Sequence, residues 1–322
     1  MRGALGGIIA GTFPPMLANC ARRNQHSEIF IARVESYAED IASVVLSGLR
    51  ELQVSVEEIR GKRILLKPNL IEPRRGAEHI NTHPLVVRGI ADAFLRMGAR
   101  NILVAEGTAH NRDTMLVLEE SGLADVLRED RIPFVDLNQE VGYSVKNAGG
   151  YTRISTFTFP LALRRADWIV SVAKMKTHHW AGVTLSMKNL FGVMPGIYYG
   201  WPKNLFHWEG IDRSILDITS TVRPHFAIVD GVVGMEGDGP IMGDPRKAGV
   251  LVMGRNLPAM DATCARIMGI NPHKIHHLES ASNRFGSIRD SDILQRGEVL
   301  ASVRTDFALV KEIGAHRGIR LS

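Results

Sequence analysis

Five short apolar runs, made mainly of β-prone residues, recur along this chain, and most of them lead through a polar or glycine turn into a helical pattern. They cover residues 63–66, 101–105, 168–173, 225–229 and 250–253. Continuous apolar strands separated by helices are typical of a parallel sheet that is covered on both faces. The chain is therefore predicted to fold as a three-layer α/β protein with a mainly parallel sheet.

Apolar residues at helical spacing predict the intervening helices. These patterns cover residues 36–52, 84–97, 113–127, 211–221 and 258–268. Residues 28–322 are long enough for one large or two modest domains. Turn residues and alternating strand character mark 140–160 as a candidate subdomain boundary, with the site in a cleft between the two parts. The segment 293–309 is expected to add strands at a sheet edge.

Composition argues against several classes of partner. The formal net charge is +5, but no long basic tract produces it, and the aromatic residues (6%) are not interleaved with a basic stripe. Nucleic acid is therefore not an expected partner. No segment has the roughly 18 unbroken apolar residues of a membrane-spanning helix. The two cysteines, Cys20 and Cys264, are too few for a disulfide framework or an iron–sulfur cluster on this chain, and Cys264 is expected in the core.

Residues 1–27 differ from the rest and are expected to be an export signal or tether. Arg2 precedes a short apolar, glycine-rich stretch that ends at Leu17-Ala18-Asn19-Cys20. This order resembles a bacterial export signal with a lipoprotein cleavage site at Cys20, although Asn19 stands where a small residue is usual. The prediction is a protein of the cell envelope or periplasm with an N-terminal membrane tether. A cytoplasmic protein with a disordered or buried N-terminus is the alternative.

The densest group of chemically active residues follows the apolar run at 168–173. Lys174, Lys176, Thr177, His178 and His179 lie within six residues, and Ser186-Met187-Lys188-Asn189 follows soon after. Only Asp167 supplies nearby negative charge, so a balanced, solvated surface does not explain this block. It predicts a site for an anion, or for a metal with an anionic ligand, and an ordinary basic loop is the alternative.

Polar residues also follow other apolar runs. Lys67 and Asn69 follow the first run, Glu106 the second and Asp230 the fourth. Because ligands of open parallel sheets bind beyond the carboxyl ends of the strands, these groups are expected to converge with the basic block. Taken alone, Lys67 is equally well explained as a surface lysine.

The residue types predict roles at this site. The predicted catalytic residues are Lys176, His178 and Lys188, and the predicted substrate-binding residues are Lys67, Asn69, Lys174, Thr177 and Asn189. Lysines suit carboxylate or phosphate as point charges. A lysine that is desolvated beside others would have a lowered pKa and could act as a base or as an imine-forming amine. His178 and His179 would point in opposite directions on an extended chain, so at most one is expected to face the site.

A divalent metal is a further candidate ligand. Its predicted ligands are Glu106, His207, Asp230 and Glu236, the last two in a glycine-dense loop at 230–243. Their spacing matches no standard zinc or calcium motif, and solvated carboxylates in a tight loop are the alternative. The sequence also lacks GxGxxG, GxxxxGK[ST] and GxSxG, which removes support for a dinucleotide fold, a P-loop and an α/β-hydrolase.

Several short motifs occur in a fixed order from about Lys67 to Asp261. They are KPNL, THP, G-x-x-x-I-x-V-x-E-G, DWIVSVAKMKTH, VTLSMKNLFG, IVDG, M-E-G-x-G-P and finally D-A. The series resembles the DUF362 family of bacteria and archaea. The resemblance implies an α/β fold, and members often carry a twin-arginine export signal or are fused to ferredoxin-type iron–sulfur modules. This chain has no CxxC pair, and no Arg-Arg pair precedes its apolar N-terminal stretch.

The leading functional prediction is an enzyme that acts on a small anionic substrate in a cleft of lysines, histidines and carboxylates. Lys67, Lys176 and Lys188 would bind or polarise the anion, and His178 would serve as acid or base. The cofactor and the oligomeric state are left open. The alternatives are a non-catalytic envelope protein that binds an anionic metabolite or a metal complex, and a redox partner of a separate iron–sulfur module.

Overall fold

One large mixed sheet organises the molecule. The computed structural model describes residues 26–109, 112–282 and 284–321, and its sheet has the strand order β11-β1-β10-β9-β7-β2-β3-β4, with β8 paired to β7. The strands of this sheet are β1 (Ser27–Arg33), β2 (Arg63–Lys67), β3 (Asn101–Glu106), β4 (Phe134–Asp136), β7 (Trp168–His178), β8 (Gly182–Thr184), β9 (Phe226–Glu236), β10 (Asp244–Gly254) and β11 (Ile293–Gly297).

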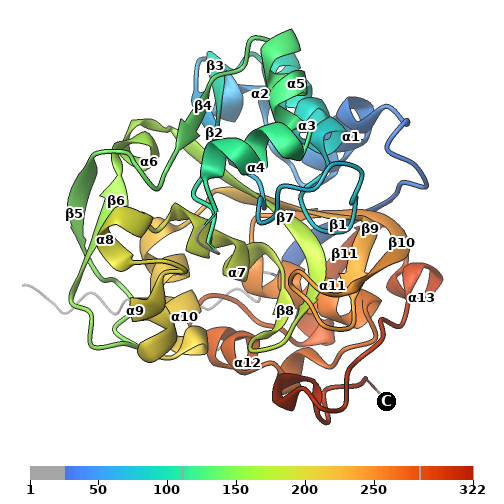
Figure 1. Ribbon diagram of the computed structural model, residues 1–322. Helices are drawn as coiled ribbons and strands as arrows, with labels where there is room; N and C mark the ends of the chain where they lie inside the picture. Colours follow the sequence, from blue (N-terminus) through green and yellow to red (C-terminus); the bar gives the residue numbers. More distant parts are fainter. Residues whose placement is uncertain (1–25, 110–111, 283, 322) are drawn as a thin grey trace, which may run out of the picture.

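Helices cover both faces of this sheet, as Figure 1 shows. They are α1 (Ile41–Glu51), α2 (Val56–Ile59), α3 (Pro84–Arg96), α4 (Thr114–Glu120), α5 (Leu123–Glu129), α6 (Leu161–Arg165), α7 (Ser186–Asn189), α8 (Gly196–Tyr199), α9 (Asn204–Trp208), α10 (Ile211–Val222), α11 (Leu257–Ile267), α12 (His276–Ser282) and α13 (Leu300–Val303). Short 3-10 turns lie at Leu190–Val193, Pro272–Lys274, Asp290–Asp292 and Gly314–His316.

Two hydrophobic cores, one on each face, result from alternation along the strands. Ile64 and Leu66 of β2 belong to a core with α1, α3 and α5, whereas Leu65 belongs to a second core with α10, α11 and α12. Successive side chains of a strand point to opposite faces, so a continuous apolar run supplies both cores. The α/β architecture predicted from these runs is confirmed, and Cys264 is buried in α11.

The sheet is mainly parallel, with three antiparallel pairings that the sequence pattern did not predict, one of them between β7 and β8. β2 pairs in parallel with β3 and β7, and β7 with β9. β10, by contrast, runs antiparallel to both β9 and β1. Residues 237–243 join β9 to β10 directly, and so short a connection permits a hairpin but no parallel crossover. The prediction of a glycine-dense loop at 230–243 is therefore wrong for its first half, because residues 230–236 belong to β9.

Three further boundaries differ from the sequence-based expectation. β7 continues to His178, because β8 and β9 both pair with its second half. The helix expected at 113–127 is two helices, because Gly122 between them adopts φ +79° and left-handed backbone ends a helix. α1 begins later than expected, at its cap Asp40, whose side chain accepts a hydrogen bond from the Ser43 N–H.

The remaining segments lie at the margins of the sheet. β11 pairs with β1 at one edge, as expected for 293–309. β5 (Gly142–Lys146) and β6 (Thr156–Pro160) form a separate two-stranded sheet within the segment 140–160. Strands from both sides of that segment join the large sheet.

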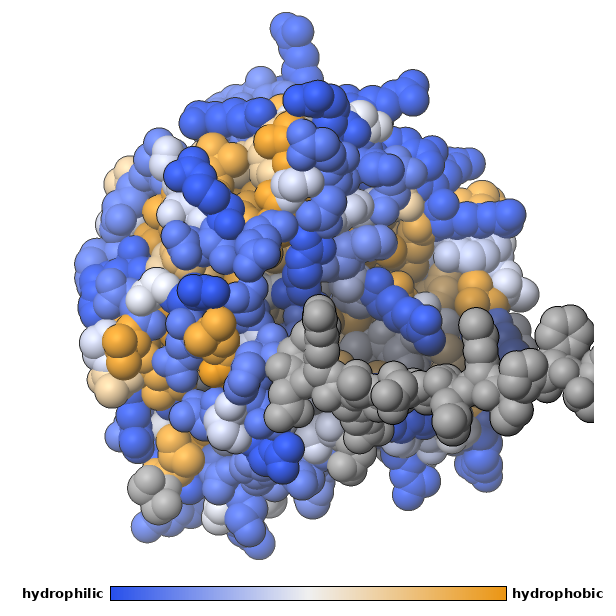
Figure 2. Space-filling view, turned by 180° about the vertical axis from the view of Figure 1, so that it is seen from behind, coloured by the Kyte–Doolittle hydropathy of each residue, from blue (hydrophilic) through white to orange (hydrophobic). Residues whose placement is uncertain are grey.

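The surface opposite the view of Figure 1 is mainly hydrophilic, with apolar groups in small separate patches (Figure 2). None of the helices in the described part of the chain combines the length and the apolar character needed to cross a bilayer. Residues 1–25 of the export signal or tether predicted at 1–27, including Cys20, lie outside the described residues, and Ser27 already belongs to β1.

Candidate functional site

A cavity of about 90 Å³ lies at the carboxyl ends of β2 and β3, beside α7 and the turn after β7. This volume accommodates a few water molecules or one small polar ligand. Its described lining consists of Lys67, Asn69, Leu70, Ile71, Glu106, Gly107, Ala109, His178, His179, Trp180, Thr184, Lys188, Asn189, Phe191, Gly192, Pro202, His207 and Pro240. The cavity therefore unites part of the predicted site, drawn from four separate stretches of the chain.

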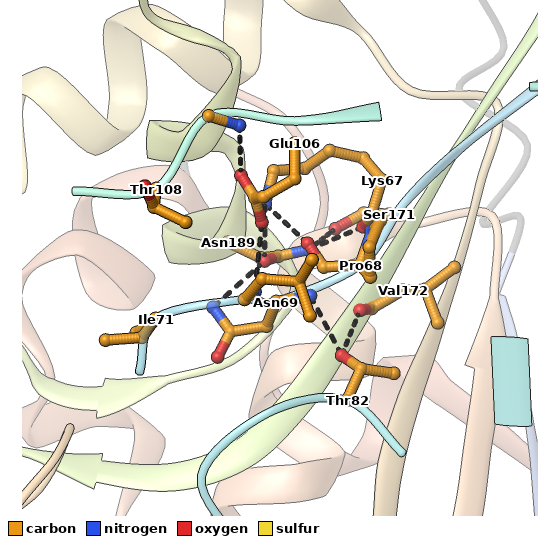
Figure 3. Close-up of polar contacts among 12 residues, drawn as sticks. Lys67, Pro68, Asn69, Ile71, Thr82, Glu106, Thr108, Ser171, Val172 and Asn189 are labelled. Atoms are coloured by element: carbon orange, nitrogen blue, oxygen red, sulfur yellow. Dashed lines mark hydrogen bonds and ion pairs between the residues drawn. The ribbon is translucent and has the colours of Figure 1, made fainter. Parts of the chain in front are cut away.

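A buried ion pair forms one wall of the cavity. The Lys67 ammonium donates to Glu106 Oε2 at 2.6 Å, and also to the Pro68 carbonyl and Asn189 Oδ1 (Figure 3). Glu106 in addition accepts from the N–H groups of Leu70 and Gly107. Burial lowers the pKa of Lys67 while Glu106 opposes that shift. Lys67 and Glu106 are therefore paired with each other and with backbone groups, and this pairing fixes the position of this wall of the cavity.

Glycine is required where the chain crosses this ion pair. A Cβ at Gly192 would collide with Glu106 Oε1 and with the end of the Lys67 side chain. The absence of a side chain lets the backbone after α7 close over the pair. This contact explains why a glycine follows the second basic block of the sequence.

Asn189 fastens α7 to β2 and β7. Its Nδ2 donates to the Lys67 carbonyl and to Ser171 Oγ, both at 3.0 Å, and its Oδ1 accepts from Asn69 Nδ2 at 3.2 Å. The Oδ1 of Asn69 is buried and has no hydrogen-bond partner within the described structure. An acceptor with no partner is therefore left in the lining of the cavity.

Lys188 is the charged group in the cavity with the least compensation. Its Nζ lies 3.8 Å from the centre of the Phe191 ring, and it has no hydrogen-bond or ion-pair partner among the residues that the structure describes. Desolvation first, and then the positive charge of Lys67, lower the pKa of Lys188 to about 7. The ring face favours the ammonium form but does not replace a counter-ion.

The histidines at the end of β7 both line the cavity, so the prediction that only one faces the site is wrong. β7 ends at His178, and His179 already belongs to the turn, where strict alternation no longer holds. Their ring centres are 4.9 Å apart. His178 Nδ1 accepts from the N–H groups of Trp180 and Ala181, and burial lowers its pKa well below the ordinary value. His179 Nδ1 is 3.8 Å from Asp238 Oδ1.

Three predicted site residues in β7 do not line the cavity. Lys174 forms a buried ion pair with Asp230 at 2.9 Å and donates to Tyr37. Lys176 donates to the carbonyls of Ile80 and Pro240, and Thr177 Oγ1 donates to the carbonyl of Gly237. Because β7 extends beyond its apolar run, these side chains lie within the sheet and join neighbouring segments instead of ending at its edge.

The predicted metal ligands are not brought together. Glu106 is occupied by Lys67 and Asp230 by Lys174. Glu236 accepts from the Ala308 N–H and lies near Arg246, while His207 lines the cavity beside Trp180. Within the described residues, no group of three or more histidine, cysteine, aspartate or glutamate side chains is arranged to hold a metal ion.

Sequence reasoning missed several residues that shape the site. Thr184 lines the cavity, and its buried Oγ1 has no hydrogen-bond partner in the described structure; a hydroxyl inside the apolar run at 183–185 was the available signal. Lys203 donates to the Gly107 carbonyl, and burial lowers its pKa to about 7. Asp261 anchors α7 by accepting from the N–H groups of Ser186 and Met187. No local pattern marks Lys203, and Asp261 stands out in the sequence only as the final D-A of the motif series, with no role attached to it.

Comparisons with solved structures give low similarity. The lactate racemase apoprotein from Thermoanaerobacterium thermosaccharolyticum matches with a TM-score of 0.39 and 14% identity, over 76% of this chain and 58% of its own. A protein from Thermotoga maritima matches with a TM-score of 0.37 and 11% identity, over 72% and 59%. This chain spans less than two thirds of either structure, and at these TM-scores neither match bears on its activity.

Comparisons of the sequence identify both a relative and a family. The thylakoid-associated protein sll1697 of Synechocystis sp. is 28% identical over 235 residues, which make up 70% of this chain and 68% of that protein. A family model described as a domain of unknown function, DUF362, matches residues 64–266. That range contains β2, β3, β7, α7 and every residue named above in the wall of the cavity. Because the match covers more than half of the chain, this protein belongs to the DUF362 family.

Proposed function

We propose that this protein is an enzyme that binds a small anionic molecule in the cavity and acts on it there. One observation carries the proposal. Asn69 Oδ1 and Thr184 Oγ1 are buried without a hydrogen-bond partner in the described structure, and the half-buried Lys188, whose Nζ contacts the Phe191 ring, lines the same cavity. Buried polar groups are nearly always paired in folded proteins, so two unpaired groups beside a lysine in one small cavity support a ligand that completes them.

The charge of the cavity supports an anion. Glu106 is the acidic residue in its described lining, and Lys67 already neutralises that carboxylate. The Lys188 ammonium is left without a counter-ion, which a carboxylate or phosphate group would supply. The volume of about 90 Å³ limits the bound group to a small one.

Two histidines suit different roles. Since His178 Nδ1 accepts from two backbone N–H groups, its neutral ring carries the proton on Nε2. We therefore propose His178 as a hydrogen-bond donor to the ligand, whereas the sequence led to the expectation of an acid or a base. His179, which is partly exposed and lies near Asp238, is the better candidate for transferring protons, because its ring reaches both the cavity and the solvent.

Calorimetric titration tests the binding step, with propionate, pyruvate and inorganic phosphate as probes. We expect at least one of them to bind the wild-type protein and to lose that binding in Lys188→Met. Lys146→Met, which removes an exposed lysine of β5, is the matched control and should bind normally. Equal binding by Lys188→Met, or no binding of any probe to the wild type, contradicts the proposal.

A non-catalytic binding protein is the second candidate. The observation in its favour is that Lys67, Glu106 and Asn189 are occupied by one another and thus hold the cavity in a fixed shape. Incubation of the protein with a bound anion separates the two candidates. Recovery of the unchanged anion after many hours supports binding alone, whereas a new product supports the enzyme.

We also propose that the protein is exported and acts in the cell envelope. The pattern of residues 1–20 supports this location, and so does the name of the thylakoid-associated relative. N-terminal sequencing of protein from the native host, combined with membrane fractionation, provides the test. An intact Met1 on protein in the cytosolic fraction would contradict export.

A further inference from the structure

The amine of Lys188 differs from the other buried lysine amines in and around this site in having no polar partner among the described residues. Lys67 donates to Glu106, Lys176 to two carbonyls and Lys203 to the Gly107 carbonyl. Lys188 Nζ contacts the Phe191 ring instead. A nucleophilic amine needs a free lone pair and access to its substrate, and among these four lysines only Lys188 is free of polar contacts and lines the cavity.

We infer that Lys188 forms a covalent imine with the carbonyl group of a small 2-oxo acid. This inference rests on the proposed function, because it takes the anion to be a carboxylate and gives it a neighbouring carbonyl group. The lysine pKa of about 7 supports it, since about half of the amine is then neutral near pH 7. The positive charge of Lys67 contributes to keeping that amine neutral.

The covalent step balances without a cofactor. The lone pair of Lys188 Nζ attacks the carbonyl carbon and forms a carbinolamine, whose nitrogen proton moves to the oxygen or to a nearby base. Loss of that oxygen as water then gives the C=N bond. Overall, one amine and one carbonyl yield one imine and one water, and no electrons are transferred. His179, which lines the same cavity as Lys188, is the group assigned to protonate the departing hydroxyl.

The other unsatisfied groups suit the rest of a 2-oxo acid. Once Lys188 is neutral, the carboxylate needs other donors, and the Thr184 hydroxyl and the Nε2–H of His178 both belong to the lining. Asn69 Oδ1 is an acceptor without a partner, which suits the hydroxyl of the carbinolamine. The small cavity favours two- to four-carbon acids over longer ones.

Borohydride trapping tests the inference on the full chain. The protein is incubated with pyruvate and sodium borohydride, and intact-mass measurement and peptide mapping then locate any reduced adduct. We expect one adduct per chain, on Lys188, formed at least tenfold faster than on exposed lysines such as Lys146. Lys188→Met should lose this adduct, and Lys146→Met should retain it.

Propionate, which resembles pyruvate but has no 2-oxo group, separates the two levels of the proposal. If propionate binds in a manner that depends on Lys188 but pyruvate leaves no adduct there, the imine inference is overturned and the proposed anion site stands. If adducts are spread over exposed lysines, the inference is likewise overturned. If neither acid binds, the imine inference is overturned, and if inorganic phosphate does not bind either, the proposed function fails as well.

Discussion

Lys188 is held where burial lowers its pKa to about 7, so its contribution to function and its contribution to stability oppose each other. A desolvated amine costs folding free energy, and functional sites often retain such groups. We predict that Lys188→Met raises the free energy of unfolding at pH 7 by about 0.5–2 kcal/mol, because the methionine keeps the contact with Phe191 without the charge. The same variant should bind propionate at least about tenfold more weakly. Urea unfolding measures the stability, and calorimetry measures the binding of propionate. A variant that is less stable than the wild type would contradict the predicted stabilisation.

The protonation of Lys188 also predicts how anion binding depends on pH. Below its pKa of about 7 the side chain is an ammonium, and above it a neutral amine. Propionate affinity should therefore be highest below about pH 6 and should decline as the pH rises to about 8, because a group titrates mainly within about one pH unit of its pKa. Lys188→Arg supplies the control, because a guanidinium stays charged throughout this range. For that variant, calorimetry should show a propionate affinity that does not change with pH. A decline as steep as that of the wild type would mean that a group other than Lys188 titrates.

At the scale of single elements, α7 depends on a contact from a distant helix. α7 has four residues and no side-chain cap of its own, and it is held by Asp261 of α11, which accepts from Ser186 N, Ser186 Oγ and Met187 N. We predict that Asp261→Ala lowers the free energy of unfolding by about 2–5 kcal/mol, because two buried N–H groups lose their acceptor. It should also weaken propionate binding, although Asp261 does not line the cavity, because α7 carries Lys188.

Asp217 provides a matched control for Asp261. It is a buried carboxylate of α10 that accepts from Asn147 Nδ2 and from the N–H groups of Tyr151 and Thr152. Asp217→Ala should cost a similar free energy of unfolding, measured in urea, but leave propionate binding unchanged. Equal loss of binding in both variants would mean that the Asp261 effect reflects general instability and not the position of α7.

At the scale of the whole molecule, buried basic groups predict an alkaline stability optimum. Burial lowers the pKa of lysines that have no carboxylate partner and of several histidines. They are Lys176, Lys188, Lys203, His79, His83, His178, His225 and His316. Between the folded and unfolded pKa values of each group, the unfolded chain holds more protons, so stability rises with pH there.

The rise should begin near pH 4, where burial places the pKa of His83, and continue beyond pH 9, because unfolded lysines hold their protons up to about pH 10.4. Cys264 and Tyr37, whose pKa values burial raises, oppose the rise at its alkaline end, because there the unfolded chain loses these protons first. Asp261 makes the stability fall as the pH rises from about 4 to 6, since burial raises its pKa to about 6. Thermal unfolding measured from pH 5 to about 9 tests the combined effect of these groups on stability. A maximum of stability below pH 7 would contradict the prediction. Lys203→Met should flatten the rise above pH 7.

Local sequence is enough to specify most of the elements and the edge at which the parallel strands end. Continuous apolar runs such as 63–66 and 101–105 predict strands buried on both faces, and Pro84 predicts where α3 begins. Because parallel strands end at one edge, the order of the runs also predicts that Lys67, Asn69 and Glu106 lie near one another. These are consequences of periodicity and chain direction, which depend only on neighbouring residues.

Which polar groups are already paired, by contrast, follows from contacts that form only in the folded chain. Lys67 meets Glu106 and Asn189 across 39 and 122 positions of the chain, and Ser186 meets Asp261 across 75. Lys174 and Lys176 look like Lys188 in sequence but are drawn into the sheet by the extended pairing of β7. Whether a charge is compensated depends on contacts between distant segments, which no local pattern encodes, and this is why Lys188 and Thr184 emerge as the unsatisfied groups only once the chain is folded.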